Sequence, residues 1–182
     1  VFCWLGNADI LLAISKLIED RMNVEKDVEE GVQVILLVED SVRFYSSYLP
    51  HIYKIIFQQS KSFMTEGLNE HQKMLRMRGR PKVLLATDYD MAVSLYNKYK
   101  NNVLGIISDI SYPRNGEMDN EAGIELCKLI KKDNEYIPFL LQSAEEKYKK
   151  ISEELGCGFI NKNSKTISIE LKDFIIKNFA FG

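Results

Sequence analysis

Two apolar runs of the sequence end in acidic residues, and carboxylates grouped in this way could hold a cation. Residues 34–38 are followed by Glu39 and Asp40, and residues 103–108 lead to Asp109. Each run has the composition of a buried strand in a parallel sheet, and such sheets bind ligands at the carboxyl ends of their strands. Three carboxyl groups within a few ångströms repel one another unless a cation lies among them. The pattern therefore predicts a divalent-cation site, and Mg²⁺ prefers such oxygen ligands.

Two further apolar runs end in residues that could serve the same site. Residues 139–141 lead to Ser143, and residues 157–161 lead to Lys162. A carboxylate can accept a phosphoryl group as a nucleophile. A metal ion, a lysine ammonium and a hydroxyl donor then supply the charge neutralisation and alignment that phosphoryl transfer requires. The five polar positions together favour phosphoryl transfer to a carboxylate.

The elements that must position these residues alternate between strand and helix. Strands are expected at 34–38, 83–87, 103–108, 139–141 and 157–161. Helices are expected after them, at about 42–63, 90–100, 121–133, 145–155 and 164–178, with a polar loop at 114–120. In such an alternation the strands are parallel and helices cover both faces of the sheet. The sequence thus predicts a three-layer, doubly wound α/β fold with five parallel strands.

Residues 1–31 are predicted to form a strand-helix appendage. The strand is expected at 1–5, an amphipathic helix at 8–23, and an acidic linker at 25–31. These elements either pack on the main domain or form the tail of a preceding one, because a strand and a helix cannot bury their apolar faces alone. The chain starts at Val1 within an apolar run, which suggests a piece of a longer polypeptide.

The first helix of the main domain is unusually long and leads into an insertion. Its apolar stripe consists of Phe44, Tyr48, Ile52, Ile55, Ile56 and Phe63. Pro50 is expected to kink the helix, and a second short helix is expected at 68–78. We assign 57–81 as a helical insertion and hypothesise that the prolonged stripe supports a homodimer.

Residues 61–82 form a locally basic segment. Its cationic residues are Lys61, Lys73, Arg76, Arg78, Arg80 and Lys82. A nucleic-acid or anionic-lipid surface is one interpretation. A solvated helix face is favoured, because no aromatic interleaving or binding motif accompanies the charges. We therefore expect no direct nucleic-acid binding.

The composition bounds the class of protein. The chain has 182 residues, 46% of them hydrophobic and 27% charged, with a net charge of -2, which suits one globular domain with an appendage. Cys3, Cys127 and Cys157 are odd in number and lack a C-x-x-C spacing, so they suggest neither a disulfide framework nor a zinc site. Cys127 and Cys157 are expected to be small core residues. A reducing, cytoplasmic location without membrane contact is predicted.

Four of these segments together carry a resemblance to a known family. They are residues 34–41, residues 107–109 with Pro113, residues 140–144 and residues 159–162. In this order they resemble the response-regulator receiver domain of two-component and phosphorelay signalling, with similarity over residues 33–180. The resemblance implies a flavodoxin-like sheet with strand order 2-1-3-4-5, in a receiver domain spanning 32–182.

The resemblance also implies roles for the site residues. Asp109 would be the phosphoacceptor, phosphorylated with Mg²⁺ by a histidine kinase or phosphotransfer protein. Glu39 and Asp40 would position Mg²⁺, with Asp109 and the backbone carbonyl of Ser111 as further ligands. A receiver of this kind catalyses its own phosphorylation and dephosphorylation as a switch and is not a metabolic enzyme.

The implied switch uses three further residues. Ser143 would be the switch hydroxyl and Lys162 the phosphate-binding lysine. Phe159 would be the aromatic residue that reorients with Ser143. Taken singly, Asp109 could be a turn residue and Ser143 a helix N-cap. For Phe159 alone an ordinary core position is the favoured interpretation.

The sequence departs from the family pattern in three places, and two other functions remain open. Asn163 replaces the usual cis-proline after the lysine, about twenty residues are inserted before the second strand, and the loop after Pro113 is longer. A degenerate receiver could act only as a dimerisation or docking module. A small Mg²⁺-dependent phosphohydrolase is disfavoured, because that class usually has an acid two residues after the nucleophile and this chain has Ser111.

Overall fold

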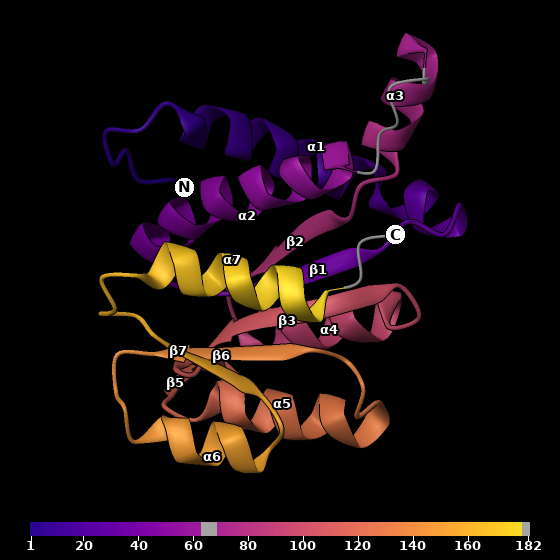
Figure 1. Ribbon diagram of the computed structural model, residues 1–182. Coiled ribbons are helices and arrows are strands. Elements are labelled where there is room, and N and C mark those ends of the chain that lie inside the picture. Colours follow the sequence, from indigo (N-terminus) through magenta and orange to yellow (C-terminus); the bar gives the residue numbers. More distant parts are fainter. Residues whose placement is uncertain (63–68, 180–182) are drawn as a thin grey trace.

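The computed structural model describes residues 1–62 and 69–179 and contains a five-stranded parallel sheet (Figure 1). Its strands are β1 (Val34–Val38), β2 (Lys82–Ala86), β3 (Val103–Asp109), β6 (Phe139–Ser143) and β7 (Gly158–Asn161). They lie in the order β2-β1-β3-β6-β7, and each pair of neighbours is parallel. This order confirms the predicted doubly wound fold, whose switch point lies between β1 and β3.

Helices cover both faces of the sheet (Figure 1). One layer contains α1 (Asp9–Glu29), α2 (Val42–Ser62) and α7 (Ile167–Asn178), and the other contains α4 (Tyr89–Tyr99), α5 (Ala122–Asp133) and α6 (Tyr148–Glu154). The sheet separates two buried apolar clusters, because alternate strand residues such as Leu36 and Leu37 face opposite layers. Of the helices in the described ranges, none is both long enough and apolar enough to cross a membrane.

The expected strand at residues 1–5 does not form. This segment has no regular secondary structure and is bonded to side chains of α2. The amide of Cys3 donates to Oγ of Ser46 at 2.9 Å, and the Tyr45 hydroxyl donates to the carbonyl of Val1. The prediction was wrong because helix side chains, rather than a neighbouring strand, take up these backbone groups.

The acidic linker predicted at 25–31 is also wrong, because α1 continues to Glu29. Two of its acidic residues have cationic partners on other elements: Glu25 pairs with Lys98, and Asp27 lies 3.1 Å from Nζ of Lys82. Val24, near the end of the same helix, is buried in one of the two apolar clusters. The helix therefore packs on the main domain along its whole length.

The insertion consists of the end of α2 and the helix α3 (Glu70–Arg78), which projects away from the sheet (Figure 1). The apolar stripe of α2 is buried from Tyr45 to Ile56 against the sheet, with Pro50 inside the helix. Phe63, the last residue of the predicted stripe, lies outside the described residues, as do the side chains of Lys73 and Arg76. Most of the stripe is therefore explained by core packing.

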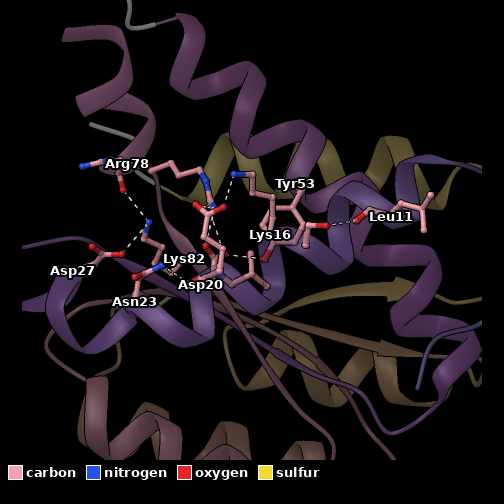
Figure 2. A network of polar contacts seen from close by, with 12 residues as sticks. Leu11, Lys16, Asp20, Asn23, Asp27, Tyr53, Arg78 and Lys82 are labelled. Carbon is pink, nitrogen blue, oxygen red and sulfur yellow. Dashed lines mark hydrogen bonds and ion pairs between the residues drawn. The ribbon is translucent and has the colours of Figure 1, made fainter. Parts of the chain in front are cut away.

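Two cations of the basic segment are buried, which corrects its interpretation as a solvated face. Arg80 and Lys82 are only 3% exposed and pair with Asp20 and Asp27 of α1. Figure 2 shows Lys82 reaching both Asp27 and the backbone carbonyl of Arg78, and Tyr53 of α2 pointing at Asp20. This network joins α1, α2 and the start of β2.

The loop predicted at 114–120 is instead a β-hairpin beside the end of β3. Its strands are β4 (Tyr112–Arg114) and β5 (Glu117–Asp119), which pair antiparallel. The two turn residues, Asn115 and Gly116, both have positive φ, at 53° and 81°. An Asn-Gly pair is the preferred sequence for such a two-residue turn, so this signal was present in the sequence.

Candidate functional site at the strand ends

The acidic residues after β1 and β3 come together at the carboxyl edge of the sheet. Leu37 and Ile107 face the layer of α2 and α7, so Glu39 and Asp109, two residues further on, face the same side. Glu39, Asp40 and Asp109 each offer a carboxylate oxygen, and these oxygens lie within 4.8 Å of one another. The convergence expected from the strand ends is found.

Lys162, directly after β7, places its ammonium between two of these carboxylates. Its Nζ lies 2.7 Å from Oε2 of Glu39 and 2.7 Å from Oδ2 of Asp109. The side chain is 5% exposed, and Nζ lies 4.2 Å from the ring centroid of Phe44 on α2. The backbone amide of Lys162 donates to the carbonyl of Ser143 at 2.9 Å. This bond extends the β6–β7 ladder and fixes the backbone position of the lysine.

Backbone amides bind the second oxygens of the two carboxylates that contact Lys162. Oε1 of Glu39 accepts from the amide of Ser41 at 3.1 Å, and Oδ1 of Asp109 accepts from the amide of Ile110 at 2.7 Å. Asp40 comes immediately after Glu39 and is less deeply buried. The carboxylates of Glu39 and Asp109 are therefore each held in position by a backbone amide and by Lys162.

The cluster carries more negative than positive charge. Burial raises the pKa of Glu39 to about 7, and the charge of Asp109 adds to this, although Lys162 acts in the opposite direction. Burial and the charge of Asp109 also raise the pKa of Asp40. Three carboxyl groups thus face one ammonium, and an additional cation would relieve their repulsion.

The residues fit a hard divalent cation. Oxygens on opposite sides of Mg²⁺ are about 4 Å apart, since each Mg²⁺–O bond is about 2.1 Å. The separation of at most 4.8 Å among the three carboxylates is close to this value. Glu39, Asp40 and Asp109 could therefore share one ion with little movement, leaving further positions for water or a phosphoryl oxygen.

The expected switch residues lie on the opposite face at the next two strand ends. Strand alternation puts Ser143 on the face that carries Leu141, and Leu141 is paired in register with Phe159. Oγ of Ser143 accepts from the amide of Glu145 at 3.1 Å, so it caps the turn that precedes α6. Phe159 is partly exposed, packs against the core and lines an open hollow with Lys149.

Ser111 and Asn163 are each held by a local hydrogen bond. Oγ of Ser111 donates to the carbonyl of Asn120 at 3.2 Å, which ties the residue before β4 to the residue after β5. The amide of Asn163 donates to Oδ1 of Asn161 at 2.8 Å. The described residues contain no cis peptide bond, so the loop after Lys162 is built with a trans peptide and an asparagine turn.

Gly123 is a positioning residue that the sequence analysis missed. A Cβ atom at this position would lie 2.1 Å from the carbonyl oxygen of Asp109. The Gly123 amide donates to the carbonyl of Ile110 at 2.8 Å. Only glycine lets the first turn of α5 pack this closely on the backbone of Asp109. A glycine at the start of a predicted helix was the available signal.

Two buried polar atoms near the cluster were also missed. The hydroxyl of Tyr48 and Nε2 of Gln142 have no hydrogen-bond partner within the described part of the chain. Gln142 is paired in register with Asp109, and Tyr48 lies one turn beyond Phe44, which contacts Lys162. In the sequence, Tyr48 is recognisable only as a member of an apolar stripe, because periodicity does not show what lies near a hydroxyl.

Comparison with known proteins identifies the fold. The sequence matches no protein-family model, and a search of the curated proteins finds no match. The structure is similar to a response regulator receiver domain protein from Clostridium thermocellum, with a TM-score of 0.54 and 15% identity, covering 81% of this chain and 94% of that chain.

Two further solved structures are similar. A chain of the CheX-CheY complex with BeF₃ and Mg²⁺ from Borrelia burgdorferi has a TM-score of 0.53 and 20% identity, with 82% of this chain and 93% of that chain covered. The non-phosphorylated HemR receiver domain from Leptospira biflexa has a TM-score of 0.51 and 22% identity, with 82% and 98% covered. The chain therefore has the fold of response-regulator receiver domains, which confirms the predicted resemblance.

Proposed function

We propose that this chain is a phosphoacceptor receiver domain that takes up a phosphoryl group on Asp109. The donor would be a phosphohistidine of a histidine kinase or phosphotransfer protein in the cytoplasm. The observation that carries the proposal is the contact of Lys162 with Asp109 and Glu39 beside Asp40, at the carboxyl edge of a receiver-fold sheet. We assign 32–182 as the receiver domain, 57–81 as its insertion and 1–31 as an appendage packed on it.

The chain's own residues would prepare Asp109 for the transfer. The carboxylate is the nucleophile, so an O–P bond forms as the N–P bond of phosphohistidine breaks. The amide of Ile110 and the ammonium of Lys162 hold the carboxylate in one orientation. Bound Mg²⁺, held by Glu39, Asp40, Asp109 and the Ser111 carbonyl, would neutralise charge on the phosphoryl oxygens.

A phosphoryl group on Asp109 would then rearrange its surroundings. It adds roughly 1.5 to 2 negative charges and strong acceptor oxygens. These oxygens compete with Glu39 for the ammonium of Lys162 and can accept a hydrogen bond from the Ser143 hydroxyl, so both groups would move toward the phosphoryl group. Phe159 would fill the space that Ser143 leaves, which changes the partner surface formed by α6, β7 and α7.

One similar structure bears on the metal and the phosphoryl group. The complex from Borrelia burgdorferi contains BeF₃ and Mg²⁺, by its description. Binding of the same pair by this chain is supported by its cluster of three carboxylates with one ammonium. We therefore expect beryllofluoride and Mg²⁺ to bind together at Asp109.

Intact-mass measurement after incubation with acetyl phosphate and Mg²⁺ tests the proposal. The parent should gain one phosphoryl group, and Asp109→Asn should gain none. Asp173→Asn changes an exposed aspartate of α7 and should behave like the parent. A parent that stays unmodified with acetyl phosphate and binds no beryllofluoride would overturn the proposal in favour of a docking module. Multiple turnover of phosphate esters would favour the phosphohydrolase.

The homodimer through 57–81 stays part of the proposal. Phe57 and Met74 line a cleft between α2 and α3, and Met74 is exposed. A dimer that uses this surface should be weakened by Met74→Lys. Sedimentation velocity at high protein concentration, with and without beryllofluoride, measures dimer formation. A monomeric parent under both conditions would contradict the dimer.

A further inference from the structure

Two cysteines far apart in the sequence meet in the core beneath α5. Cys127 lies in the middle of α5, and Cys157 directly precedes β7. Their sulfur atoms are 2.6 Å apart, although both cysteines are free thiols. Two thiols that only touch would stand well over 3 Å apart, and a disulfide bond is about 2.05 Å long. The fold therefore holds these two sulfurs at a separation close to bonding.

Local structure explains why Cys157 points at α5. The chain leaves α6 through Gly156, whose φ is +68°. The Cys157 amide donates to the carbonyl of Ser152 at 2.8 Å, so the helix end fixes the position of the cysteine. Left-handed glycine at this place is the usual way to end a helix and redirect the chain. The approach of the two sulfurs thus follows from a rigid turn.

The two thiols are chemically unequal. The contact between the two thiols lowers the pKa of Cys157, against the effect of burial, and the nearby charge of Lys131 acts in the same direction as the contact. The same contact, together with burial, raises the pKa of Cys127. Cys127 is fully buried, whereas Cys157 keeps 8% of its surface exposed. Cys157 is thus the sulfur better suited to meet a small oxidant, with Cys127 placed to resolve the product.

We propose that Cys127 and Cys157 form a reversible disulfide when the protein meets a peroxide. The Cys157 thiolate attacks one peroxide oxygen, the O–O bond breaks, and the sulfur is oxidised to a sulfenic acid with release of one water after protonation. The Cys127 sulfur then attacks the sulfenic sulfur, an S–S bond forms, and its proton leaves with the hydroxyl as a second water. One peroxide is reduced to two waters, and a thiol reductant reverses the reaction.

The disulfide would act on the segment that carries the expected switch residue. The bond closes the loop from 127 to 157, which contains β6, Ser143 and α6. It also fixes the start of β7, two residues before Phe159. This consequence rests on the proposed function: oxidation should restrain the change at α6 and β7 and leave Asp109 and Lys162 in place. The disulfide itself requires no phosphorylation.

Thiol counting by mass tests the inference on the full chain. The reduced protein, denatured in excess N-ethylmaleimide, should take up three labels, one for each cysteine. After treatment with hydrogen peroxide it should take up one label, on Cys3, and dithiothreitol should restore three. A count that stays at three, a bond that includes Cys3, or gain of two oxygens on one sulfur without an S–S bond would overturn the proposal.

Variants assign the bond and separate it from phosphorylation. Cys3→Ser should still lose two labels on oxidation, whereas Cys127→Ser and Cys157→Ser should form no internal disulfide. Because the parent itself gives the decisive count, poor folding of a variant does not remove the test. Phosphoryl uptake by the oxidised and reduced parent is then compared. Loss of uptake in both forms would refute the proposed function alone, and an unchanged thiol count would refute this inference alone.

Discussion

Two buried clusters of this molecule each pair carboxylates with a cation, and they differ in their balance of charge. At the start of β2, Asp20 accepts from Nη1 and Nη2 of Arg80 at 3.1 and 2.6 Å. It also accepts from the Tyr53 hydroxyl at 2.8 Å and the Val83 amide at 2.9 Å. At the carboxyl edge of the sheet, the ammonium of Lys162 pairs with Glu39 and Asp109, and the carboxylate of Asp40 lies beside them.

The comparison separates a structural cluster from one suited to binding. In the first cluster, the Asp20 carboxylate meets the Arg80 guanidinium, and four hydrogen bonds saturate its oxygens. Such a pair has little to gain from a ligand, and it contributes mainly by joining α1, α2 and β2. In the second cluster, excess negative charge is partly buried at an edge of the sheet, so binding an additional cation would release free energy.

Breaking the balanced cluster, in which Asp20 pairs with Arg80, should have the largest effect on stability. Asp20→Ala leaves Arg80 buried without its carboxylate, so the free energy of unfolding should fall by about 3 to 5 kcal/mol. Urea denaturation followed by circular dichroism measures the loss. Glu25→Ala, which removes the partner of Lys98 at an exposed site, is the matched control and should change little. A small effect of Asp20→Ala would show that the pair is dispensable.

Removing one carboxyl group from the unbalanced cluster of Glu39, Asp40, Asp109 and Lys162 should raise the free energy of unfolding. In metal-free buffer above pH 7, Glu39→Gln should stabilise the protein by about 1 to 2 kcal/mol. The folded pKa of about 7 lies above the ordinary 4.5, so the parent loses stability as pH rises between these values. The advantage of the variant should therefore shrink toward pH 4.5. Urea midpoints across this pH range give the profile, and an advantage that is constant with pH would contradict it.

Added metal should stabilise the unbalanced cluster by a comparable amount. At a Mg²⁺ concentration ten times its Kd, the parent should gain about 1.4 kcal/mol of unfolding free energy. Asp40→Asn should lose most of this gain, because it removes one of the three converging carboxylates. Thermal melts with Mg²⁺ and with EDTA measure the difference. Equal stabilisation of Asp40→Asn and the parent would place Mg²⁺ elsewhere.

Two tyrosine hydroxyls, one in each region, should give the most direct contrast between the two clusters. Tyr53→Phe removes a hydrogen bond to Asp20 and should cost about 1.5 to 3 kcal/mol. Tyr48→Phe removes a buried hydroxyl that lacks a partner within the described residues, so stability should be unchanged or rise by up to about 1 kcal/mol. Both variants are compared by urea denaturation without metal. A clear loss for Tyr48→Phe would show that its hydroxyl is bonded in solution.

The local sequence pattern was sufficient to predict the strands that have Glu39, Asp109 and Lys162 at their carboxyl ends. Each strand is a short apolar run with a polar end, and the direction of a parallel strand fixes which edge that end reaches. The hairpin at Asn115 and Gly116 was predictable from its turn residues and was missed. The prediction of a strand at residues 1–5 was wrong, because apolar composition does not show whether a neighbouring strand is available.

The sequence by itself determined the alternation of strands and helices and the polar residues at the strand ends, because these depend on neighbours within a few positions. Only the tertiary structure decided that Arg80 and Lys82 are buried partners of α1, that Gly123 packs on Asp109, and that Cys127 meets Cys157. These contacts join residues from 14 to 60 positions apart. The packing of whole helices on the sheet sets such distances, and no local pattern of residues encodes it.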